Sequence, residues 1–434
     1  MPDELQLSIE KLVYGGDGLA HADGNTVFVP YVLPGEEVRA AAKSKRKKLV
    51  WAQLLEVTSA SAQREGARCP HFQTCGGCHY QHIPAAEQLR LKKEILRETL
   101  SRLGGIQWSG PIQDHFAEPY GYRNRAQWAV RDANPRAIGY FLPESSVIVP
   151  IDECPVLSPL LAKTFGQLQE LARSNRFPEK ALEIEAFADS ADAKIALNVA
   201  FERFPKPAAE LAAAFREALP QLESLLLADE SKNRFELSGP GYLFHDAEGF
   251  RYRVSHLSFF QVNRFLIEDL LQTMVAGAKG EVALDLYAGV GFFTLPLTRT
   301  FKRVVSVDAN LAATRDLHVN AESAGAAVIS HNEHAEEFLR KTTEKPDFVV
   351  LDPPRAGLGA EAAAKLAELG AAEIAYLSCD PSTLARDLAV LTGSKKSGDA
   401  ASASTRYEIV EMHLFDLFPQ TYHIETLVRL RRAP

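Results

Sequence analysis

Apolar and polar residues alternate in short runs over the first sixty positions. The segments LQLSIEKL, NTVFVPYVL and LVWAQLLEV place apolar side chains mainly at every second residue, and Gly- and Asp-rich turns separate them. A period of two is typical of strands that bury one face, and many short strands with frequent turns favour a sandwich or barrel. The pattern predicts a small all-β barrel over residues 1–60.

The pattern then changes twice before residue 250. Residues 61–84 carry few helix or strand signals, whereas AAEQLRLKKEILRETLSRLG at 85–104 has the spacing of an amphipathic helix ended by Gly104 and Gly105. Further on, YRNRAQWAVR and AIGYFLPESSVIVPI have strand-like patterning, and LLAKTFGQLQELARS has a helical period. We therefore predict an α+β central domain over residues 61–250.

Strand-like and helical stretches alternate regularly from about residue 280. The expected strands are VALDLYAG, RVVSVDAN, AVISHNE, DFVVLDPP, EIAYLSCDP, YEIVEMHLFD and IETLVRLRR. This rhythm predicts a largely parallel, doubly wound α/β domain over residues 251–434. Within it, the small polar residues TGSKKSGDAASAST at 392–405 predict a flexible insertion.

Charge and composition narrow the class of protein. A net charge of −8 argues mildly against a nucleic-acid partner, but KSKRKK at 43–48 is strongly basic and could grip a phosphate backbone or be a solvated loop. No apolar run reaches the ~18–20 residues of a membrane helix, and the acidic N-terminus does not resemble a secretory signal. Five cysteines in a chain without such a signal favour a reducing cytoplasm.

Three acidic positions and a glycine turn suggest a cofactor pocket. Asp285 begins the pattern D-x-x-x-G-x-G with Gly289 and Gly291, Asp308 ends the next strand, and Asp352 ends the fourth. In doubly wound sheets, ligands bind beyond the carboxyl ends of the strands. The turn lacks the G-x-G-x-x-G spacing that a pyrophosphate needs and is typical of S-adenosylmethionine sites. The alternative is a tight turn without a ligand.

A single cysteine, Cys379, ends the fifth expected strand beside that pocket. An isolated thiol is most often a buried apolar residue. A thiolate beside a methyl donor has a specific use, however, because it can add to C6 of a uracil and make C5 nucleophilic. A base must then remove the C5 proton. Glu425 is the candidate base, with His423 as its competitor on pKa grounds.

The other four cysteines have the spacing of metal ligands. Cys69, Cys75 and Cys78 form C-x5-C-x2-C, and Cys154 follows as a lone Cys-Pro. Four thiolates can hold zinc. The long first spacing and the terminal Cys-Pro favour an iron–sulfur cluster over zinc.

Together these motifs resemble the RNA (uracil-5-)-methyltransferase family. The matching stretches, in family order, are CGGCHYQH, SFFQVN, DLYAGVGFFTLPL, LDPPRAG, LSCDPSTLARD and FPQTYHIE. They run from about residue 60 to the C-terminus. The first sixty residues are similar to the RNA-binding TRAM barrel, an oligonucleotide-fold relative that many members carry.

The resemblance implies a Rossmann-like class I methyltransferase domain and a role for each matched residue. Cys379 would be the nucleophile and Glu425 the base that removes the C5 proton. Four residues would bind S-adenosylmethionine in addition to the turn glycine Gly289: Gln261, Tyr287, Asp308 and Asp352. A [4Fe-4S] cluster would be held by Cys69, Cys75, Cys78 and Cys154. The expected partner is RNA, with 23S ribosomal RNA as the favoured target and the transfer RNA T-loop as the alternative.

Three positions depart from the family pattern, and two other functions are disfavoured. Phe292 stands where several relatives have Asn, Asp380 replaces a more usual Asn after Cys379, and Ala288 replaces a frequent Cys. A non-catalytic RNA-binding or iron-sensing protein is disfavoured because the site residues are intact. An amine-directed methyltransferase is disfavoured because Arg355 follows Asp352-Pro-Pro, where such enzymes carry an aromatic residue.

Overall fold

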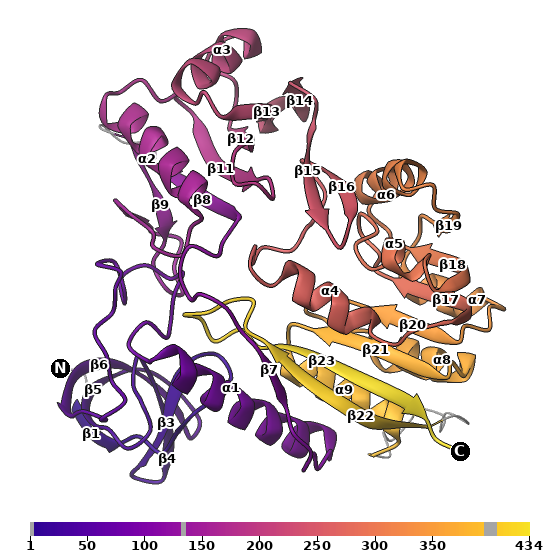
Figure 1. Cartoon of the computed structure of the whole chain (residues 1–434). Helices are drawn as coiled ribbons and strands as arrows, with labels where there is room; N and C mark the ends of the chain where they lie inside the picture. Colours follow the sequence, from indigo (N-terminus) through magenta and orange to yellow (C-terminus); the bar gives the residue numbers. More distant parts are fainter. Residues whose placement is uncertain (1–3, 132–135, 395–405) are drawn as a thin grey trace. The chain divides into compact units, whose positions relative to one another are not determined.

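The structure is a computed structural model that describes residues 4–131, 136–394 and 406–434. Contacts divide the chain into two compact units, traced in Figure 1. The first contains residues 1–98, 140–151 and 418–423, and the second contains residues 99–139, 152–417 and 424–434. The predicted insertion at 392–405 lies mostly outside the described residues. No helix in the described ranges is long and apolar enough to cross a membrane.

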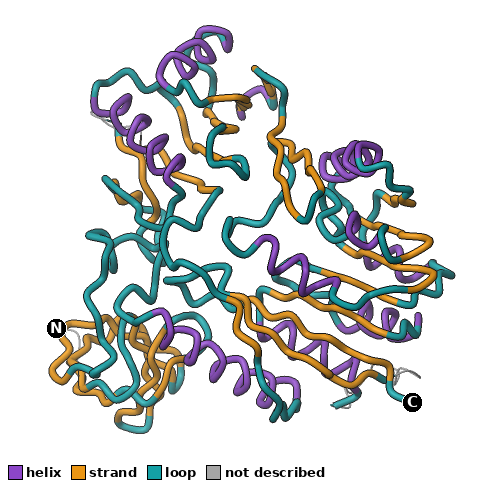
Figure 2. The backbone as a smooth tube through the Cα atoms, in the orientation of Figure 1, coloured by secondary structure: helices purple, strands orange, loops and turns teal. Residues whose placement is uncertain are grey.

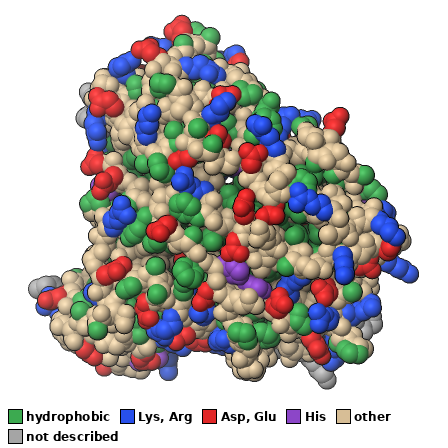
Figure 3. Space-filling model, viewed as in Figure 1, with side chains coloured by type: hydrophobic (Ala, Val, Ile, Leu, Met, Phe, Trp, Pro, Cys, Tyr) green, Lys and Arg blue, Asp and Glu red, His purple; other side chains and the backbone are tan. Residues whose placement is uncertain are grey.

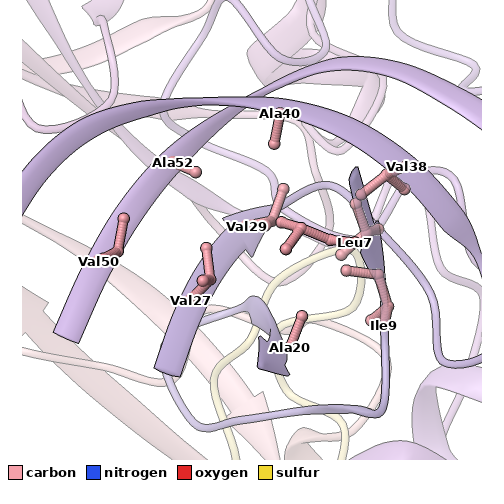
Figure 4. Close-up of a cluster of buried hydrophobic side chains, with 10 residues drawn as sticks. Leu7, Ile9, Ala20, Val27, Val29, Val38, Ala40, Val50 and Ala52 are labelled. Atoms are coloured by element: carbon pink, nitrogen blue, oxygen red, sulfur yellow. The ribbon is translucent and has the colours of Figure 1, made fainter. Parts of the chain in front are cut away.

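The first unit begins with a six-stranded sheet, as the alternating pattern predicted. Its strands run in the order β1-β5-β6-β4-β3-β2. Their bounds are β1 (Glu4–Ser8), β2 (Lys11–Leu12), β3 (Asp17–Ala22), β4 (Asn25–Pro30), β5 (Glu37–Arg46) and β6 (Leu49–Ser59). The sheet curves around small aliphatic side chains such as Val27, Val29 and Val38 (Figure 4). The basic run 43–48 covers the exposed end of β5 and the turn into β6.

A helix and a distant loop complete the first unit. The helix α1 (Ala85–Thr99) is followed by a π-helical turn, η1 (Leu100–Gly104), that ends at Gly105 with φ 69°. The Gln88 side chain of α1 donates to Oε1 of Gln420 (3.0 Å) and accepts from its backbone N–H (3.0 Å). The N–H groups of His79 and Tyr80 donate to the Gln420 carbonyl oxygen. These bonds explain why residues 418–423 belong to the N-terminal unit.

In the described residues, the second unit contains two larger sheets and a two-stranded hairpin, and the first of the larger sheets is mixed. Its strands follow the order β9-β8-β11-β12-β13-β14, in which only β12 and β13 are parallel. The strands are β8 (Arg125–Arg131), β9 (Ala137–Phe141), β11 (Ala181–Ala188), β12 (Ile195–Phe201), β13 (Leu222–Asp229) and β14 (Arg234–Ser238), and the helices are α2 (Pro159–Arg173), α3 (Ala208–Ala218) and the 3-10 turn η2 (Glu230–Lys232). The predicted strand at 137–151 is two strands, because a turn separates β9 from β10 (Ile148–Pro150), and β10 lies in the first unit.

The second sheet is the predicted α/β domain, and its helices alternate with the strands along the chain (Figure 2). The strand order is β19-β18-β17-β20-β21-β23-β22-β7. The strands are β17 (Gly280–Leu286), β18 (Phe301–Val307), β19 (Val328–His331), β20 (Phe348–Leu351), β21 (Glu373–Ser378), β22 (Tyr407–Phe415) and β23 (Glu425–Arg432), joined by β7 (Gln113–His115). The helices are α4 (Ile267–Val275), α5 (Thr294–Leu297), α6 (Leu311–Ser323), α7 (Ala335–Lys341), α8 (Ala360–Leu369) and α9 (Pro381–Thr392).

This sheet is parallel only over its first five strands. Strand β23 pairs antiparallel with both β21 and β22, while β22 pairs parallel with β7. The chain order reverses between β17 and β20, so the carboxyl ends of these two strands flank the switch point where such sheets bind ligands. A hairpin of β15 (Tyr242–Ala247) and β16 (Phe250–Ser255) leads into the domain.

One buried ion pair holds the end of the N-terminal sheet. The Glu36 side chain is fully buried and accepts hydrogen bonds from Nε (2.6 Å) and a terminal nitrogen (2.8 Å) of Arg64, and from the N–H groups of Leu33 and Ser61. Burial alone would raise the pKa of Glu36, but these bonds outweigh it and lower the pKa below its usual value. The charged form is therefore the stable one in the folded protein.

We expect Arg64→Ala to lower the free energy of unfolding by about 3–5 kcal/mol, because the buried carboxylate loses its partner. Arg39→Ala is the matched control, because Arg39 pairs with Glu4 and Glu56 on the surface and should cost at most ~1 kcal/mol. Since the pKa of Glu36 is lowered by folding, the stabilisation is present above its unfolded pKa and is lost as the pH falls. Urea unfolding at pH 7 and pH 4 measures both effects, and equal losses for the two variants would contradict this account.

Candidate functional site

The turn after β17 needs glycine for two reasons. Gly291 has φ 90°, and a Cβ atom there would lie 3.1 Å from Cγ of Leu317. Gly289 has φ 55° in open space. Tyr287 adopts φ 62° although it is not a glycine, and such strained backbone concentrates at functional sites. The turn therefore brings bare backbone to the carboxyl edge of the sheet.

Asp285 lies beneath this turn and is fully buried. Its Oδ2 accepts a hydrogen bond from the Thr294 hydroxyl (2.6 Å), and its Oδ1 has no hydrogen-bond partner among the described residues. Burial raises the pKa of Asp285 to about 8, and the negative charges of Asp308 and Asp352 add to the effect. The three acids of the predicted pocket are thus close enough to interact.

Asp308 follows β18 and contacts the glycine turn directly. Its Oδ2 accepts from the N–H of Gly289 (2.8 Å), and its Oδ1 accepts from the N–H of Asn310 (2.7 Å). The carboxylate is therefore fixed in orientation at the edge where a ribose would be bound.

Asp352 and Gln261 meet at the end of β20. The side-chain amide of Gln261 donates to Oδ2 of Asp352 at 3.5 Å. Burial raises the pKa of Asp352 to about 7, while the Gln261 hydrogen bond opposes the rise. Gln261 itself is 7% exposed and comes from a segment between β16 and α4. These two predicted residues, distant in sequence, are adjacent in the structure.

Tyr287 points away from these acids toward α7. Its hydroxyl donates to Oε1 of Glu336 (2.8 Å), and burial together with this carboxylate raises the pKa of the phenol. Because the hydroxyl is engaged, the part of Tyr287 that remains for a ligand is its ring and backbone.

Cys379 and Glu425 occupy neighbouring positions at the next two strand ends. Ser378 at the end of β21 pairs with Thr426 of β23, so the following position on β21 and the preceding position on β23 are neighbours. Burial raises the pKa of the Cys379 thiol to about 12, with further contributions from Glu425 and Asp352. The positive charge of Arg355 opposes this rise. The thiol is half-buried and Glu425 is 5% exposed.

The structure explains two departures from the family pattern. Asp380 is the N-cap of α9, where its Oδ1 accepts from the N–H groups of Ser382 (2.8 Å) and Thr383 (3.1 Å), a role that Asp and Asn perform equally well. Phe292 is a core residue: its ring lies 5.3 Å from that of Phe260 and 5.8 Å from that of Tyr252.

His423, the alternative base, belongs to the first unit with the 418–423 loop. Its ring lies 4.6 Å from that of Tyr422 and 5.4 Å from that of Phe418. These contacts give the imidazole a packing role in that loop.

The four other cysteines are divided between the units. Cys69, Cys75 and Cys78 lie in the first and Cys154 in the second, all half-buried and none in a disulfide. The N–H of Gly77 donates to Sγ of Cys75 (3.4 Å), and burial followed by the charge of Cys69 raises the pKa of this thiol. Within the described ranges, no group of three or more His, Cys, Asp or Glu side chains is gathered as a metal site. Cysteine is a suitable ligand for zinc or for an iron–sulfur cluster. The described residues, however, do not bring three or more such side chains together as a metal site.

Three residues contribute to the site although no site role was predicted for them from the sequence. Arg355 lies close enough to lower the thiol pKa, Asn310 caps α6 and orients Asp308, and Asp316 binds the segment before Gln261. A cavity of about 470 Å³ is lined in part by Asn310 and residues 257–259. Asp316 is a charged residue on the buried side of α6, and such a residue among apolar neighbours was the available signal for it.

Known proteins are similar to this chain over most of its length. The model of the family described as tRNA (Uracil-5-)-methyltransferase matches residues 85–433. A 23S rRNA (uracil(1939)-C(5))-methyltransferase of Pseudomonas entomophila is 34% identical over 97% of this chain and 92% of its own length. One of the same description from Alkalilimnicola ehrlichii is 30% identical over 99% and 97%, and an uncharacterized RNA methyltransferase of Aquifex aeolicus is 32% identical over 98% and 98%.

A solved structure shares the fold. The tRNA (uracil-54, C5)-methyltransferase of Pyrococcus abyssi, in complex with S-adenosyl-L-homocysteine, superposes with a TM-score of 0.74 at 24% identity over 98% of this chain and all of its own. The arrangement of the sheet and the match over most of the chain agree. This chain belongs to the tRNA (uracil-5-)-methyltransferase family.

Proposed function

We propose that this protein transfers a methyl group from S-adenosylmethionine to C5 of a uridine in RNA through a covalent bond between Cys379 and C6 of the base. The reaction class is that of the family. The observation that carries the residue assignment is the pairing of a half-buried thiol with a carboxylate at adjacent strand ends, beside Asp352. The function requires that the uridine leave its stack, because C6 cannot be reached within a helix.

The thiol begins the reaction. Sγ of Cys379 forms a bond to C6, and the displaced electron pair makes C5 enolate-like and nucleophilic. The thiol proton passes to solvent in this step, because the raised pKa keeps the resting thiol neutral at pH 7. Arg355, whose charge lowers that pKa, favours the thiolate.

The carboxylate ends the reaction. After C5 has gained the methyl group, it carries both that group and a proton. Glu425 removes the proton, the electron pair re-forms the C5–C6 double bond, and the bond from C6 to Sγ breaks. The departing thiolate takes up a proton, which the protonated Glu425 can supply, and the methylated base is released.

The donor would bind at the neighbouring strand ends. S-adenosylmethionine supplies an electrophilic methyl group when it is bound. Asp308, held by Gly289, is oriented to accept ribose hydroxyls. Asp352, bonded to Gln261, acts on the pKa of the Cys379 thiol. The glycine turn lets backbone approach the donor.

The proposed target is 23S ribosomal RNA, because relatives over nearly the whole chain carry that description. The transfer RNA T-loop is the second candidate, favoured by the shared fold with the Pyrococcus abyssi enzyme. Positive and negative side chains are interspersed on the face shown in Figure 3, so local basic clusters must provide the contacts with phosphates. The exposed run 43–48 of the proposed TRAM barrel is one such cluster.

The proposal also includes three domains, with the boundaries 1–60, 61–250 and 251–434, and a cytoplasmic location.

A [4Fe-4S] cluster on Cys69, Cys75, Cys78 and Cys154 is a further part of the proposal. Half-buried thiols that form no disulfide and the N–H···S bond to Cys75 support thiolate ligation. The cluster would supply structural support.

Cys379→Ala should lower methyl transfer to RNA by roughly 10⁴-fold or more, because C5 is no longer activated. Glu425→Gln should instead accumulate a covalent protein–RNA species, since the adduct forms but cannot release its proton. Transfer of labelled methyl groups to a 23S fragment and to a T-arm hairpin, with denaturing electrophoresis, measures both. Turnover by the Cys379 variant would contradict the covalent mechanism. Methylation of the T-arm hairpin alone would show that the target is transfer RNA and not 23S ribosomal RNA.

The charge of Glu425 should control the reactivity of the thiol before any RNA is bound. Glu425→Gln removes a negative neighbour and therefore lowers the pKa of Cys379, so alkylation by iodoacetamide at pH 8–9 should be roughly 3- to 10-fold faster. Arg355→Gln should slow it for the opposite reason. Mass spectrometry of the peptide containing Cys379 gives the rates, and unchanged rates in both variants would show that these charges do not reach the thiol.

Anaerobically purified protein should contain about four iron atoms and four acid-labile sulfides per chain. Cys75→Ser should lower both, whereas Cys379→Ala is the control that should leave them unchanged. Elemental analysis decides between the metals: zinc without sulfide would replace the cluster with a zinc site.

A further inference from the structure

The segment that carries Gln261 has almost no regular structure of its own. Residues 255–263, here called the bridging segment, run from the end of β16 toward α4. Gln261 is brought beside Asp352 at 3.5 Å, so the placement of this segment decides the geometry next to the proposed reacting groups. Its position must come from side chains of neighbouring elements.

Asp316 on α6 supplies the densest set of such contacts. Its carboxylate is fully buried and accepts three hydrogen bonds of 2.7 Å: from the N–H and the hydroxyl of Ser255 and from the hydroxyl of Ser258. Arg253 lies 3.1 Å from its Oδ1. One side chain thus binds both the first residue of the bridging segment and a residue three positions further on.

The same helix contacts both parts of the proposed donor site. Asn310 caps the N-terminus of α6, where its side-chain amide donates to the carbonyl oxygen of Leu257 (3.1 Å). The backbone N–H of Asn310 donates to the carboxylate of Asp308. One turn after Asp316, Asn320 donates to the carbonyl oxygen of Val290 in the glycine turn (2.9 Å) and accepts from the N–H of Arg253 (2.7 Å). Residues 310, 316 and 320 therefore tie the bridging segment, the ribose-binding acid and the turn to a single rigid element.

Contacts on the other side of the segment keep it from shifting toward α6. The Phe260 ring packs 5.3 Å from Phe292, and His256 is hydrogen-bonded to Ser224 (2.8 Å) and to Asn198 of the mixed sheet. Arg125 donates to the carbonyl oxygen of Ser258 (2.7 Å). With these contacts in place, the loss of Asp316 would release the segment on one side only.

We propose that Asp316 is a positioning residue for methyl transfer: its bonds to Ser255 and Ser258 set where Gln261 stands relative to Asp352 and Asp308. The inference rests on the proposed function, since it concerns the geometry of that reaction. Asp316 touches neither donor nor base in this account and acts through the bridging segment. A displacement of about 1 Å in a positioning element can lower a rate by ~100-fold.

The test uses Asp316→Ala, Asp316→Asn and Ser258→Ala. Asp316→Ala should lower kcat by ~10- to 100-fold and weaken binding of S-adenosylhomocysteine. Asp316→Asn should restore most of both, because the amide oxygen still accepts from Ser255 N–H and the Ser258 hydroxyl. Ser258→Ala removes one bond only and should lower kcat by less than Asp316→Ala does.

Asp347→Ala is the matched control. Its carboxylate accepts from the N–H groups of Glu281 (2.7 Å) and Val282 (3.0 Å) at the amino ends of β17 and β20, away from the site. It should lower the melting temperature as much as Asp316→Ala does but keep kcat within ~2-fold of the parent at a temperature where all variants are folded.

Equal kcat and equal binding of S-adenosylhomocysteine in Asp316→Ala and the parent would overturn the inference, whatever the melting temperatures. Failure of Asp316→Asn to recover more than Asp316→Ala would also overturn it. If the parent protein methylates no RNA, that result contradicts the proposed function and not the inference about Asp316. Calorimetry with S-adenosylhomocysteine then still reports whether Asp316 shapes the donor site.

Discussion

The arrangement of this molecule depends on the shared edge at which parallel strands end. Asp285, Asp352 and the Cys379 thiol come from three adjacent strands, and in each case burial raises the pKa. Burial stabilises the neutral form of each group, because a charge at this edge loses hydration. The edge thus holds three polar groups whose pKa is close to neutral pH or above it, rather than three fixed charges.

Chain segments from far apart must be held at this edge, and buried polar bonds rather than apolar packing alone hold them. Asp316 and Asn320 bind the bridging segment and the glycine turn. In the first unit, Gln88 binds the loop 418–423 that directly precedes β23. A hydrogen bond specifies one relative position of two groups, whereas an apolar contact allows them to slide. A site that aligns a thiol with a base therefore needs hydrogen bonds.

Family membership establishes the chemistry more firmly than the substrate. The descriptions of the family model and of the solved structure with the same fold name transfer RNA. The descriptions of the relatives that match nearly the whole chain name 23S ribosomal RNA. The residues proposed for catalysis would act on a uracil ring, which both kinds of RNA contain. Under this proposal the choice between them would depend on surfaces outside the strand ends, such as the exposed basic run of β5 and β6.

The sequence alone determined the local elements and the types of the reacting groups. Alternation predicted a small all-β unit before residue 60, and the β/α rhythm predicted β17 to β23. The positions of Asp308, Asp352 and Cys379 at strand ends followed from the boundaries of apolar runs. The roles of these residues stay predictions, as does the cluster on the four cysteines. Only the tertiary structure decided that β23 runs antiparallel beside β21 and brings Glu425 to Cys379, that β7 joins the same sheet, and that Asp316 anchors the bridging segment. Strand pairing and buried hydrogen bonds join residues tens to hundreds of positions apart, and no local pattern of apolar and polar residues encodes which distant partner a strand end or carboxylate will meet.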